Sequence, residues 1–363
     1  MIKASLIGAL IPLAGCMSLP AVRTAECGFA PGPAVTFSLD GKTAHARIDV
    51  LTYNIEGLPW PARRNRAPLL REIAQRLAAF RAGGSGPQII VFQEVFSNAA
   101  SRAVVSSGYQ SLTAGPRAGS RQDPNTEGPL PGRRRIMRGE IRSNFLSSGL
   151  VTATDWPIIS TSYRPFARGS CAGFDCLSNK GVLYAEIAIP GVPGTIDVFN
   201  THMQARRASR VSEERHAPAH HRQTVELSQF VDSTGDPDRP TIVAGDFNMR
   251  NSDIRWDHFK RKVRMDNVHR FCADPTEECE VLQDWEHPDQ WRRVQDKHFF
   301  APGQVVKIRP VRAEGMFDDG PSGPVLSDHE GFRVIYELSW PADAQAVGLD
   351  CPARTATVGT PTP

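Results

Sequence analysis

The stretch Thr241-Ile242-Val243-Ala244-Gly245-Asp246-Phe247-Asn248 decides the fold. Its first four residues are β-branched or small and apolar, which is typical of a short strand buried on both faces of a sheet. Gly245 loosens the backbone, and the polar residues Asp246 and Asn248 then follow two positions apart, so their side chains point to the same side. This carboxylate–amide pair suits a hard divalent cation that carries a phosphate. An Asx-turn that closes a core strand is the alternative.

Four other apolar runs end in similar polar residues. The runs 50–53, 90–93, 197–199 and 325–327 lead, in that order, into Asn54, Glu94, Asn200-Thr201-His202 and Asp328-His329. Charged groups at the ends of buried strands need partners, and a metal ion with its phosphate would supply them. One such residue is usually structural, but five motifs together indicate a shared polar site.

Composition indicates a soluble globular chain with ample apolar material for a core. The chain has 363 residues, of which 40% are hydrophobic and 22% charged, and its formal net charge is +3. Chains of this length form either two domains or one large α/β domain. So small a charge does not indicate a nucleic-acid partner, and local basic clusters matter more.

The first residues predict a lipoprotein signal peptide over residues 1–15. Met1-Ile2-Lys3 gives a positive start, a short apolar run follows, and Leu13-Ala14-Gly15-Cys16 resembles the bacterial lipobox, in which the cysteine is lipidated. An ordinary cleaved signal is the alternative. We expect a lipid on Cys16 that holds the protein in the bacterial cell envelope. Met17 replaces the aspartate often linked to inner-membrane retention, which favours the outer membrane, on its periplasmic or surface face.

The rest of the chain divides into three predicted regions. We expect a tether and first strand over 16–45, a catalytic domain over 46–340, and a Pro/Thr/Ala-rich tail over 341–363. Apolar periodicity predicts helices over 68–80 and 206–232. Strands are predicted at 47–53, 88–92, 149–153, 181–189, 195–200, 241–245, 297–300 and 331–338. Strands mixed with few helices favour a layered α/β sandwich.

Six cysteines remain besides Cys16, namely Cys27, Cys171, Cys176, Cys272, Cys279 and Cys351. In an exported protein, we expect local disulfides 171–176 and 272–279 and a terminal disulfide 27–351, although other pairings are possible. A zinc site is the rival interpretation. Neither close pair has the C-x-x-C spacing of such sites, and no paired histidines lie beside them.

The ordered motifs resemble the endonuclease/exonuclease/phosphatase superfamily, also called DNase I-like. The matching residues are Tyr53-Asn54-Ile55, Gln93-Glu94-Val95, Asn200-Thr201-His202, Gly245-Asp246-Phe247-Asn248 and Ser327-Asp328-His329. The resemblance covers nearly all of residues 47–338. It implies a four-layer α/β/β/α sandwich and hydrolysis of phosphate esters with Mg²⁺, for which Mn²⁺ can substitute.

Within that superfamily the chain is similar to secreted neutral sphingomyelinases. The similar stretches are Phe92-Gln93-Glu94-Val95-Phe96, Asn179-Lys180-Gly181-Val182-Leu183-Tyr184 and Asn200-Thr201-His202-Met203-Gln204-Ala205. The chain departs from the family pattern at Gln295-Asp296-Lys297, where an Asp-Tyr pair is usual. Asp296 takes the place of that aspartate.

The resemblance assigns a metal site and a base. Glu94 is the main Mg²⁺ ligand, with Asn54 and Asp328 assisting, and this sparse oxygen set suits an ion that keeps waters and phosphate oxygens. His329 is the general base that takes a proton from the attacking water, and Asp296 orients it.

The resemblance also implies roles for three residues around the nucleophile and the phosphate. Asp246 would orient the nucleophile, Asn248 would hold a phosphate oxygen, and His202 would stabilise charge that develops on the phosphate or the leaving oxygen. Lys180 adds positive charge near the phosphate, or else is an exposed solubilising lysine.

Two clusters outside the motifs are ambiguous. The arginine-rich loop 133–142 is either a binding surface for lipid headgroups or nucleic-acid backbone, or a solvated face. His216, His220 and His221 lie in the second predicted helix, and we interpret them as surface residues because they do not share one helix face.

The sequence therefore predicts a monomeric, lipid-anchored, Mg²⁺-dependent phosphodiesterase. Its expected substrate is a phospholipid of the sphingomyelin type. An exported nuclease and an inositol-phosphate phosphatase are alternatives with the same site. A non-catalytic lipoprotein scaffold is disfavoured, because no motif residue is lost.

Overall fold

The computed structural model describes residues 19–25, 29–124, 126–141, 143–282, 293–317, 324–346 and 348–349. The signal peptide, the lipidation site Cys16 and the terminal pair Cys27 and Cys351 lie outside these residues, as does Arg142. The domain boundaries at residues 15, 45 and 340 stay predictions.

Two β-sheets form the centre of the molecule. In the described part of the chain, the first has eight strands. Its order is β11 (Glu280–Val281), β13 (Lys307–Met316), β14 (Gly331–Pro341), β2 (Thr43–Asn54), β3 (Ile89–Gln93), β5 (Val151–Thr154) and β4 (Ser111–Ala114), with β1 (Thr36–Phe37) paired to β2. The second has six, in the order β10 (Asp266–Asn267), β12 (Asp296–Ala301), β9 (Thr241–Asp246), β8 (Thr195–His202), β7 (Gly181–Ala188) and β6 (Ile158–Pro165).

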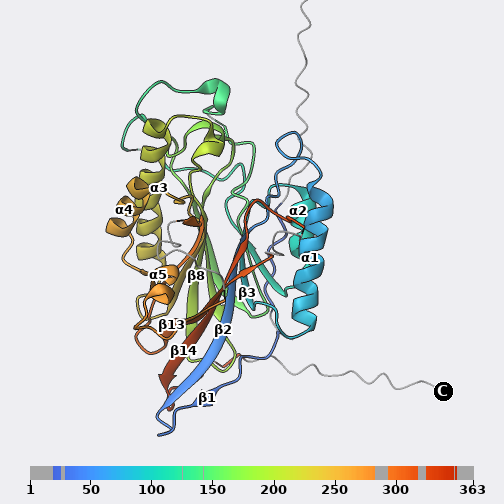
Figure 1. Ribbon diagram of the computed structural model, residues 1–363, viewed down its shortest axis with the longest axis vertical. Helices are drawn as coiled ribbons and strands as arrows, with labels where there is room; N and C mark the ends of the chain where they lie inside the picture. Colours follow the sequence, from blue (N-terminus) through green and yellow to red (C-terminus); the bar gives the residue numbers. More distant parts are fainter. Residues whose placement is uncertain are drawn as a thin grey trace, which may run out of the picture.

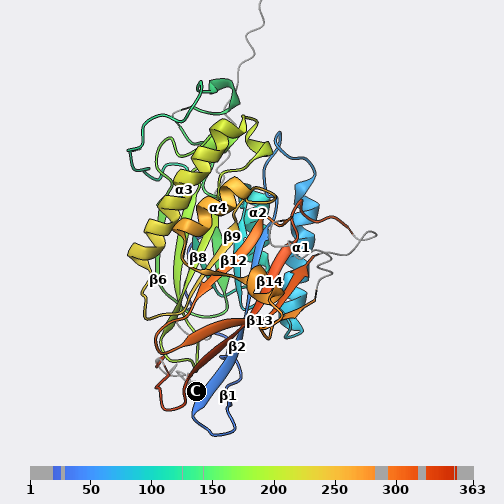
Figure 2. The same cartoon turned by 60° about the vertical axis from the view of Figure 1, so that its left-hand side comes forward.

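Helices cover the outer face of each sheet (Figures 1 and 2). The first sheet is covered by α1 (Arg66–Ala82) and α2 (Asn98–Ser106), and the second by α3 (Glu213–Thr234) and α4 (Asp253–Lys262). The short helix α5 (Val268–Ala273) contacts β12 and β13. Single 3₁₀ turns are η1 (Ile136–Arg138), η2 (Gly173–Leu177) and η3 (Arg207–Ser209).

Three apolar cores hold these layers together. One lies between the sheets and includes Ile48, Val198 and Val334, one lies under α1 and α2, and one lies under α3 and α4. Buried apolar surface of this extent is the main stabilising contribution in a domain. The predicted four-layer α/β/β/α sandwich is confirmed.

Strand direction gathers the predicted site at one edge. β2 runs parallel to β3 and β8 parallel to β9, so the carboxyl ends of each pair lie together. β14 is antiparallel to β2, and β12 is antiparallel to β9, so these two strands begin where their neighbours end. All the polar strand ends therefore lie at one edge of the sandwich.

Several local predictions are confirmed. The helix predicted over 68–80 from its apolar periodicity is α1. The two predicted local disulfides, Cys171–Cys176 and Cys272–Cys279, are also present. The helix over 206–232 is shorter than predicted, because Arg210 has left-handed backbone (φ 58°) and α3 begins only at Glu213. In the described part of the chain, no helix is long and apolar enough to cross a bilayer.

Candidate active site

Asp246, at the end of β9, is the centre of the site. Its Oδ2 atom lies 3.2 Å from Asn54 Nδ2, 3.3 Å from His202 Nε2 and 3.7 Å from His329 Nε2. Its Oδ1 atom accepts a hydrogen bond of 2.9 Å from the backbone N–H of Asn248. The fold thus brings residues from four separate motifs around one buried carboxylate.

The Asx-turn interpretation of residues 241–248 is confirmed, while a cation and phosphate beside Asp246 and Asn248 stay a prediction. The bond from the Asn248 N–H to Asp246 Oδ1 spans two residues, which is the hydrogen bond of an Asx-turn, and Asn248 has left-handed backbone (φ 52°). Gly245 is required because a Cβ there would lie 2.0 Å from the carbonyl oxygen of Thr201. The turn leaves Asp246 Oδ2 facing the histidines.

His329 is held by Asp296 at the start of β12. Its Nδ1 atom lies 2.5 Å from Asp296 Oδ2, and its backbone N–H donates to Ser327 Oγ at 3.2 Å. Ser327 Oγ in turn donates to the Asn54 carbonyl at 2.6 Å, which ties this loop to the end of β2. Burial alone would lower the pKa of His329, but the carboxylates of Asp296 and Asp246 raise it well above its ordinary value.

The departure at Lys297 does not displace Asp296. Side chains alternate along β12, and the Lys297 ammonium lies 5.7 Å from the centre of the Trp256 ring, under α4. Burial there lowers the pKa of Lys297 to about 7. Asp296 therefore keeps the predicted place beside His329.

His202 has a different neighbour, the buried ammonium of Lys180. Lys180 Nζ lies 3.0 Å from each of His202 Nε2, Asp175 Oδ2 and the carbonyl oxygen of Met203. Burial lowers the pKa of His202 well below its ordinary value, and the positive charge of Lys180 adds to this effect. Lys180 is thus no exposed solubilising lysine, and it keeps His202 neutral.

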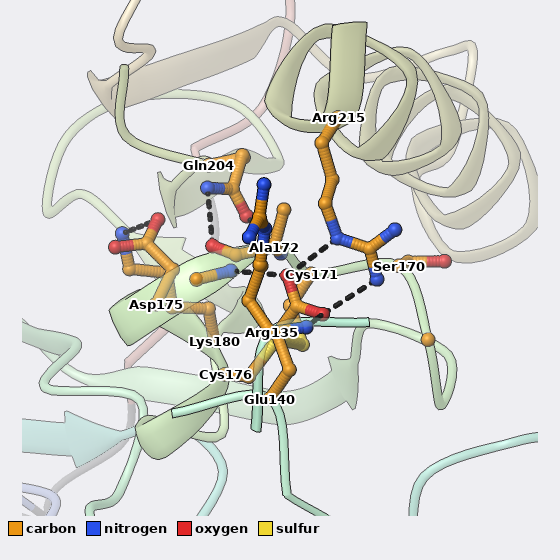
Figure 3. The surroundings of a disulfide bond; sticks show 12 residues. Arg135, Glu140, Ser170, Cys171, Ala172, Asp175, Cys176, Lys180, Gln204 and Arg215 are labelled. Atoms are coloured by element: carbon orange, nitrogen blue, oxygen red, sulfur yellow. Dashed lines mark hydrogen bonds and ion pairs between the residues drawn. A yellow bond between two sulfur atoms is a disulfide. The ribbon is translucent and has the colours of Figure 1, made fainter. Parts of the chain in front are cut away.

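The loop closed by the Cys171–Cys176 disulfide supplies the partner of Lys180 (Figure 3). Asp175 in this loop also accepts from the backbone N–H of Ala205 at 2.5 Å. Gln204 forms two bonds to the backbone of Ala172, at 2.8 and 3.0 Å. The disulfide loop is therefore fixed to the segment that follows His202.

Glu94 fits the predicted role of a cation ligand. Burial raises the pKa of its carboxyl to about 7, and the nearby carboxylate of Asp328 adds to the rise. Its side-chain neighbour is Asn54, whose Nδ2 donates to Glu94 Oε1 at 3.3 Å, while Asp328 is half-exposed and lies 3.3 Å from Arg63. Glu94 has left-handed backbone (φ 59°), a conformation that is often found at functional sites. A bound cation would offset the repulsion between the two carboxylates.

These donors are two carboxylates and an amide, a sparse set of hard oxygen ligands. Among the described residues, no group of three or more His, Cys, Asp or Glu side chains forms a complete metal site. Mg²⁺ is usually held by one or two carboxylates together with waters and phosphate oxygens. The residues present therefore fit this ion.

The prediction that His216, His220 and His221 are surface residues is wrong for His216 and His220. Both are buried, because α3 packs against the second sheet and α4, and only His221 keeps partial exposure. His220 Nε2 lies 2.9 Å from the Phe247 carbonyl oxygen, and His216 Nδ1 lies 2.8 Å from a guanidinium nitrogen of Arg255. They support the loops of the site from behind.

Arg255, on α4, is a supporting residue that sequence analysis missed. Its guanidinium donates to the carbonyl oxygens of Gln204 at 2.6 Å, Asn248 at 2.8 Å and Ala205 at 3.3 Å. It thereby joins the segment after His202 to the turn after Asp246. Burial, followed by the charge of Arg206, lowers the pKa of Arg255 to about 9. An arginine in a highly charged helix gives no sequence signal for such a role.

Comparison with known proteins identifies the family and supports the fold. A model of the Endonuclease/Exonuclease/phosphatase family matches residues 51–300. A sphingomyelinase of Mycobacterium tuberculosis is 26% identical over 319 residues, covering 81% of this chain and 54% of that protein. The chain thus spans about half the length of this relative.

Two solved structures share the fold. Beta toxin from Staphylococcus aureus with bound magnesium ions has a TM-score of 0.56 at 16% identity, covering 80% of this chain and 99% of that chain. D. rerio TDP2 complexed with a single-strand DNA product has a TM-score of 0.53 at 11% identity, covering 80% and 98%. Because the family model matches well over half of the sequence, this chain belongs to the endonuclease/exonuclease/phosphatase family.

Proposed function

We propose that the protein is a metal-dependent phosphodiesterase that hydrolyses phospholipid headgroups, in the manner of a sphingomyelinase. The observation that carries this proposal is the arrangement around Asp246, where the His329–Asp296 pair, neutral His202 and the Asn54–Glu94 pair meet. A base, a phosphate donor and a cation ligand within one site suit the displacement of an alkoxide from phosphorus by water.

In its neutral form, His329 takes the proton of the attacking water, and the raised pKa makes it a strong proton acceptor. The bond from its Nδ1 to Asp296 fixes the ring and stabilises the imidazolium that results. Asp246 lies beside His329 Nε2 and accepts a hydrogen bond from the same water, which directs the water oxygen toward phosphorus. The new P–O bond forms as the bond to the leaving oxygen breaks, with no covalent intermediate on the protein.

His202 and Asn248 bind the phosphate. His202 is neutral, and its Nδ1 has no hydrogen-bond partner among the described residues. We assign it the role of donor to a phosphate or leaving oxygen. Asn248 Nδ2 donates to the Met203 carbonyl at 3.1 Å, which places this amide beside the same segment. Lys180 acts through His202.

The residues that would hold Mg²⁺, or Mn²⁺ in its place, are Glu94, Asn54 and Asp328. When bound, the ion supplies polarisation of the phosphate and neutralises charge that develops on it.

A phospholipid substrate is supported by the sphingomyelinase relative and by the predicted lipid on Cys16, which would hold the enzyme at a membrane. With sphingomyelin, the products are ceramide and phosphocholine. A nuclease is the second candidate, because the TDP2 structure of the same fold holds a single-strand DNA product.

We also infer a monomer attached to the outer membrane. Incorporation of labelled fatty acid into the parent, and its loss in Cys16→Ala, tests the anchor. Equal labelling of both proteins would contradict it.

The deciding experiment offers sphingomyelin, phosphatidylcholine and plasmid DNA to the full chain side by side, with Mg²⁺ and with chelator. We expect chelator-sensitive release of phosphocholine from sphingomyelin. Cleavage of DNA alone would replace the lipid substrate with nucleic acid. Hydrolysis that persists in chelator would remove the metal from the proposal.

A further inference from the structure

Four large apolar side chains are exposed near the site. Met137 keeps 91% of its surface in solvent, Phe145 65%, Ile136 58% and Phe174 41%. Scattered apolar residues on a surface are ordinary, but a group of them marks an interaction site. Ile136 and Met137 lie in η1, and Phe174 lies in η2, within the disulfide loop.

Contacts between the segments place these residues on one surface. A Cβ at Gly139, directly after η1, would lie 3.1 Å from the Phe174 Cα and 3.0 Å from the Leu177 side chain. The Phe145 N–H donates to the Leu177 carbonyl at 2.8 Å. η1 and Phe145 therefore both lie against η2. The green loop that contains η1 lies at the end of the molecule where the strands of the site end (Figures 1 and 2).

Arginines surround this apolar group. Arg133, Arg134, Arg135 and Arg138 are all exposed. Residues 129–147 contain a single acidic residue, Glu140, and it is buried against Arg215, whose Nε lies 2.7 Å from Glu140 Oε1 (Figure 3). No acidic side chain of this segment is thus left to neutralise the exposed arginines. We call Ile136, Met137, Phe145, Phe174 and these four arginines the apolar–arginine surface.

The surface adjoins the catalytic residues. The Asn179 N–H donates to the Leu146 carbonyl at 3.0 Å, and Asn179 precedes Lys180, the neighbour of His202. A partner that covers Phe145 would therefore lie close to the phosphate-binding side of the site.

The chemistry of the surface favours a lipid bilayer. Apolar side chains enter the boundary between headgroups and acyl chains, while arginines beside them bind the phosphates. Single-stranded nucleic acid would favour aromatic residues between the arginines for base stacking. Phe145 and Phe174 lie on this surface, but the residues between Arg135 and Arg138 are the aliphatic Ile136 and Met137.

We propose that the apolar–arginine surface docks the protein on bilayers that contain anionic phospholipid, independently of any lipid on Cys16, and turns the site toward the headgroups. The orienting role rests on the proposed phospholipid hydrolysis, whereas docking is measured without turnover.

The test uses the full chain with Cys16→Ala, sedimented with vesicles in chelator. Vesicles of phosphatidylcholine are compared with vesicles that also contain phosphatidylglycerol. We expect binding to the mixed vesicles, which weakens with salt because the attraction of exposed charges is screened. Ile136→Asp with Met137→Asp should weaken binding at least tenfold. Arg133→Ser with Arg134→Ser should weaken it about fivefold per arginine and reduce the salt dependence.

Leu39→Asp is the matched control. Leu39 is fully exposed in the turn between β1 and β2, at the opposite end of the molecule (Figure 1), and its replacement should leave binding unchanged. All variants should keep the parent's thermal unfolding midpoint and its hydrolysis of a water-soluble phosphodiester.

Unchanged vesicle binding in the η1 variants, or an equal loss in Leu39→Asp, overturns the proposal. So does arginine-dependent binding of a single-stranded oligonucleotide without binding of vesicles. If no phospholipid is hydrolysed but the η1 variants still lose vesicle binding, docking stands and the proposed function fails.

Discussion

Two histidines lie on either side of the same carboxylate and differ in nearly every other respect. His202 Nε2 and His329 Nε2 are 3.3 and 3.7 Å from Asp246 Oδ2. Lys180 lies against His202, whereas Asp296 lies against His329. Burial lowers the pKa of His202 and the charge of Lys180 adds to this effect, whereas the carboxylates of Asp296 and Asp246 raise the pKa of His329 against the effect of burial.

The difference shows that the charged residue placed beside each imidazole by a neighbouring strand shifts the pKa of that imidazole. Lys180 directly precedes β7, which pairs with the strand that carries His202, and Asp296 begins β12, which pairs with the strand that carries Asp246. Strand pairing, and not proximity in sequence, places Lys180 beside His202 and Asp296 beside His329. His329 is therefore the stronger base of the two, while His202 remains a neutral donor.

Replacing the histidines should have the largest effect. We expect His329→Ala to lower kcat for a phosphodiester by roughly 10³-fold, since a positioned base is lost, and His202→Ala to lower it by roughly 10²-fold, since a donor to the phosphate is lost. Steady-state rates with Mg²⁺ test this, with unfolding midpoints as the control for folding. Parent-like activity in His329→Ala would remove the base from the proposed mechanism.

The second prediction concerns Glu94, the proposed cation ligand. We expect Glu94→Gln to abolish the rise in thermal unfolding midpoint that Mg²⁺ gives the parent, because a ligand that binds only the folded state stabilises it. Without metal, the variant should be at least as stable as the parent, because a desolvated carboxylate that the charge of Asp328 repels is removed.

Glu72→Gln is the control for this prediction. Glu72 pairs with Arg76 on the exposed side of α1, far from the site, and its replacement should leave the Mg²⁺ response intact. A normal Mg²⁺ response in Glu94→Gln would show that Glu94 is not a ligand.

Asp296 and Lys180, the charged neighbours of the two histidines, can each be replaced while both imidazole rings stay in place. Asp296→Asn removes the charge that favours the imidazolium, so the pKa of His329 should fall. Lys180→Met removes the charge that opposes it, so the pKa of His202 should rise. NMR titration of the imidazoles in metal-free protein measures the direction of each shift. Lys260→Met, which removes the exposed Lys260–Asp257 pair, is the control. Unshifted histidines would break the comparison.

Sequence reasoning predicted which residues the fold gathers around Asp246, because buried apolar runs and polar strand ends are local signals. It identified His329 and Asp296, but it left Lys180 between two roles, because its contact with His202 is made across a strand pair. It missed β6, which is largely exposed, and β13, which contains Pro310 and several charges. It could not identify Arg255 as a supporting residue, because that role depends on how α4 packs against the loops that contain Gln204 and Asn248.

A third buried histidine separates the effect of burial from that of a neighbouring charge. His298 lies between the sheets, where its Nδ1 is 3.1 Å from the Tyr336 hydroxyl, and burial lowers its pKa to about 3. Because the folded-state pKa is below the ordinary 6.5, the unfolded chain binds the proton first as the pH falls. The stability that His298 contributes is therefore complete above pH 6.5 and is lost progressively below it.

We expect this one residue to lower the free energy of unfolding by about 2 kcal/mol between roughly pH 7.5 and pH 5. His298→Gln should remove that part of the pH dependence, whatever its packing cost at pH 7.5, and urea unfolding of both proteins at the two pH values measures the difference. Other buried histidines contribute equally to both proteins and cancel. An identical pH dependence would mean that burial between the sheets does not lower the pKa of an imidazole, and the low pKa of His202 would then depend on Lys180 alone.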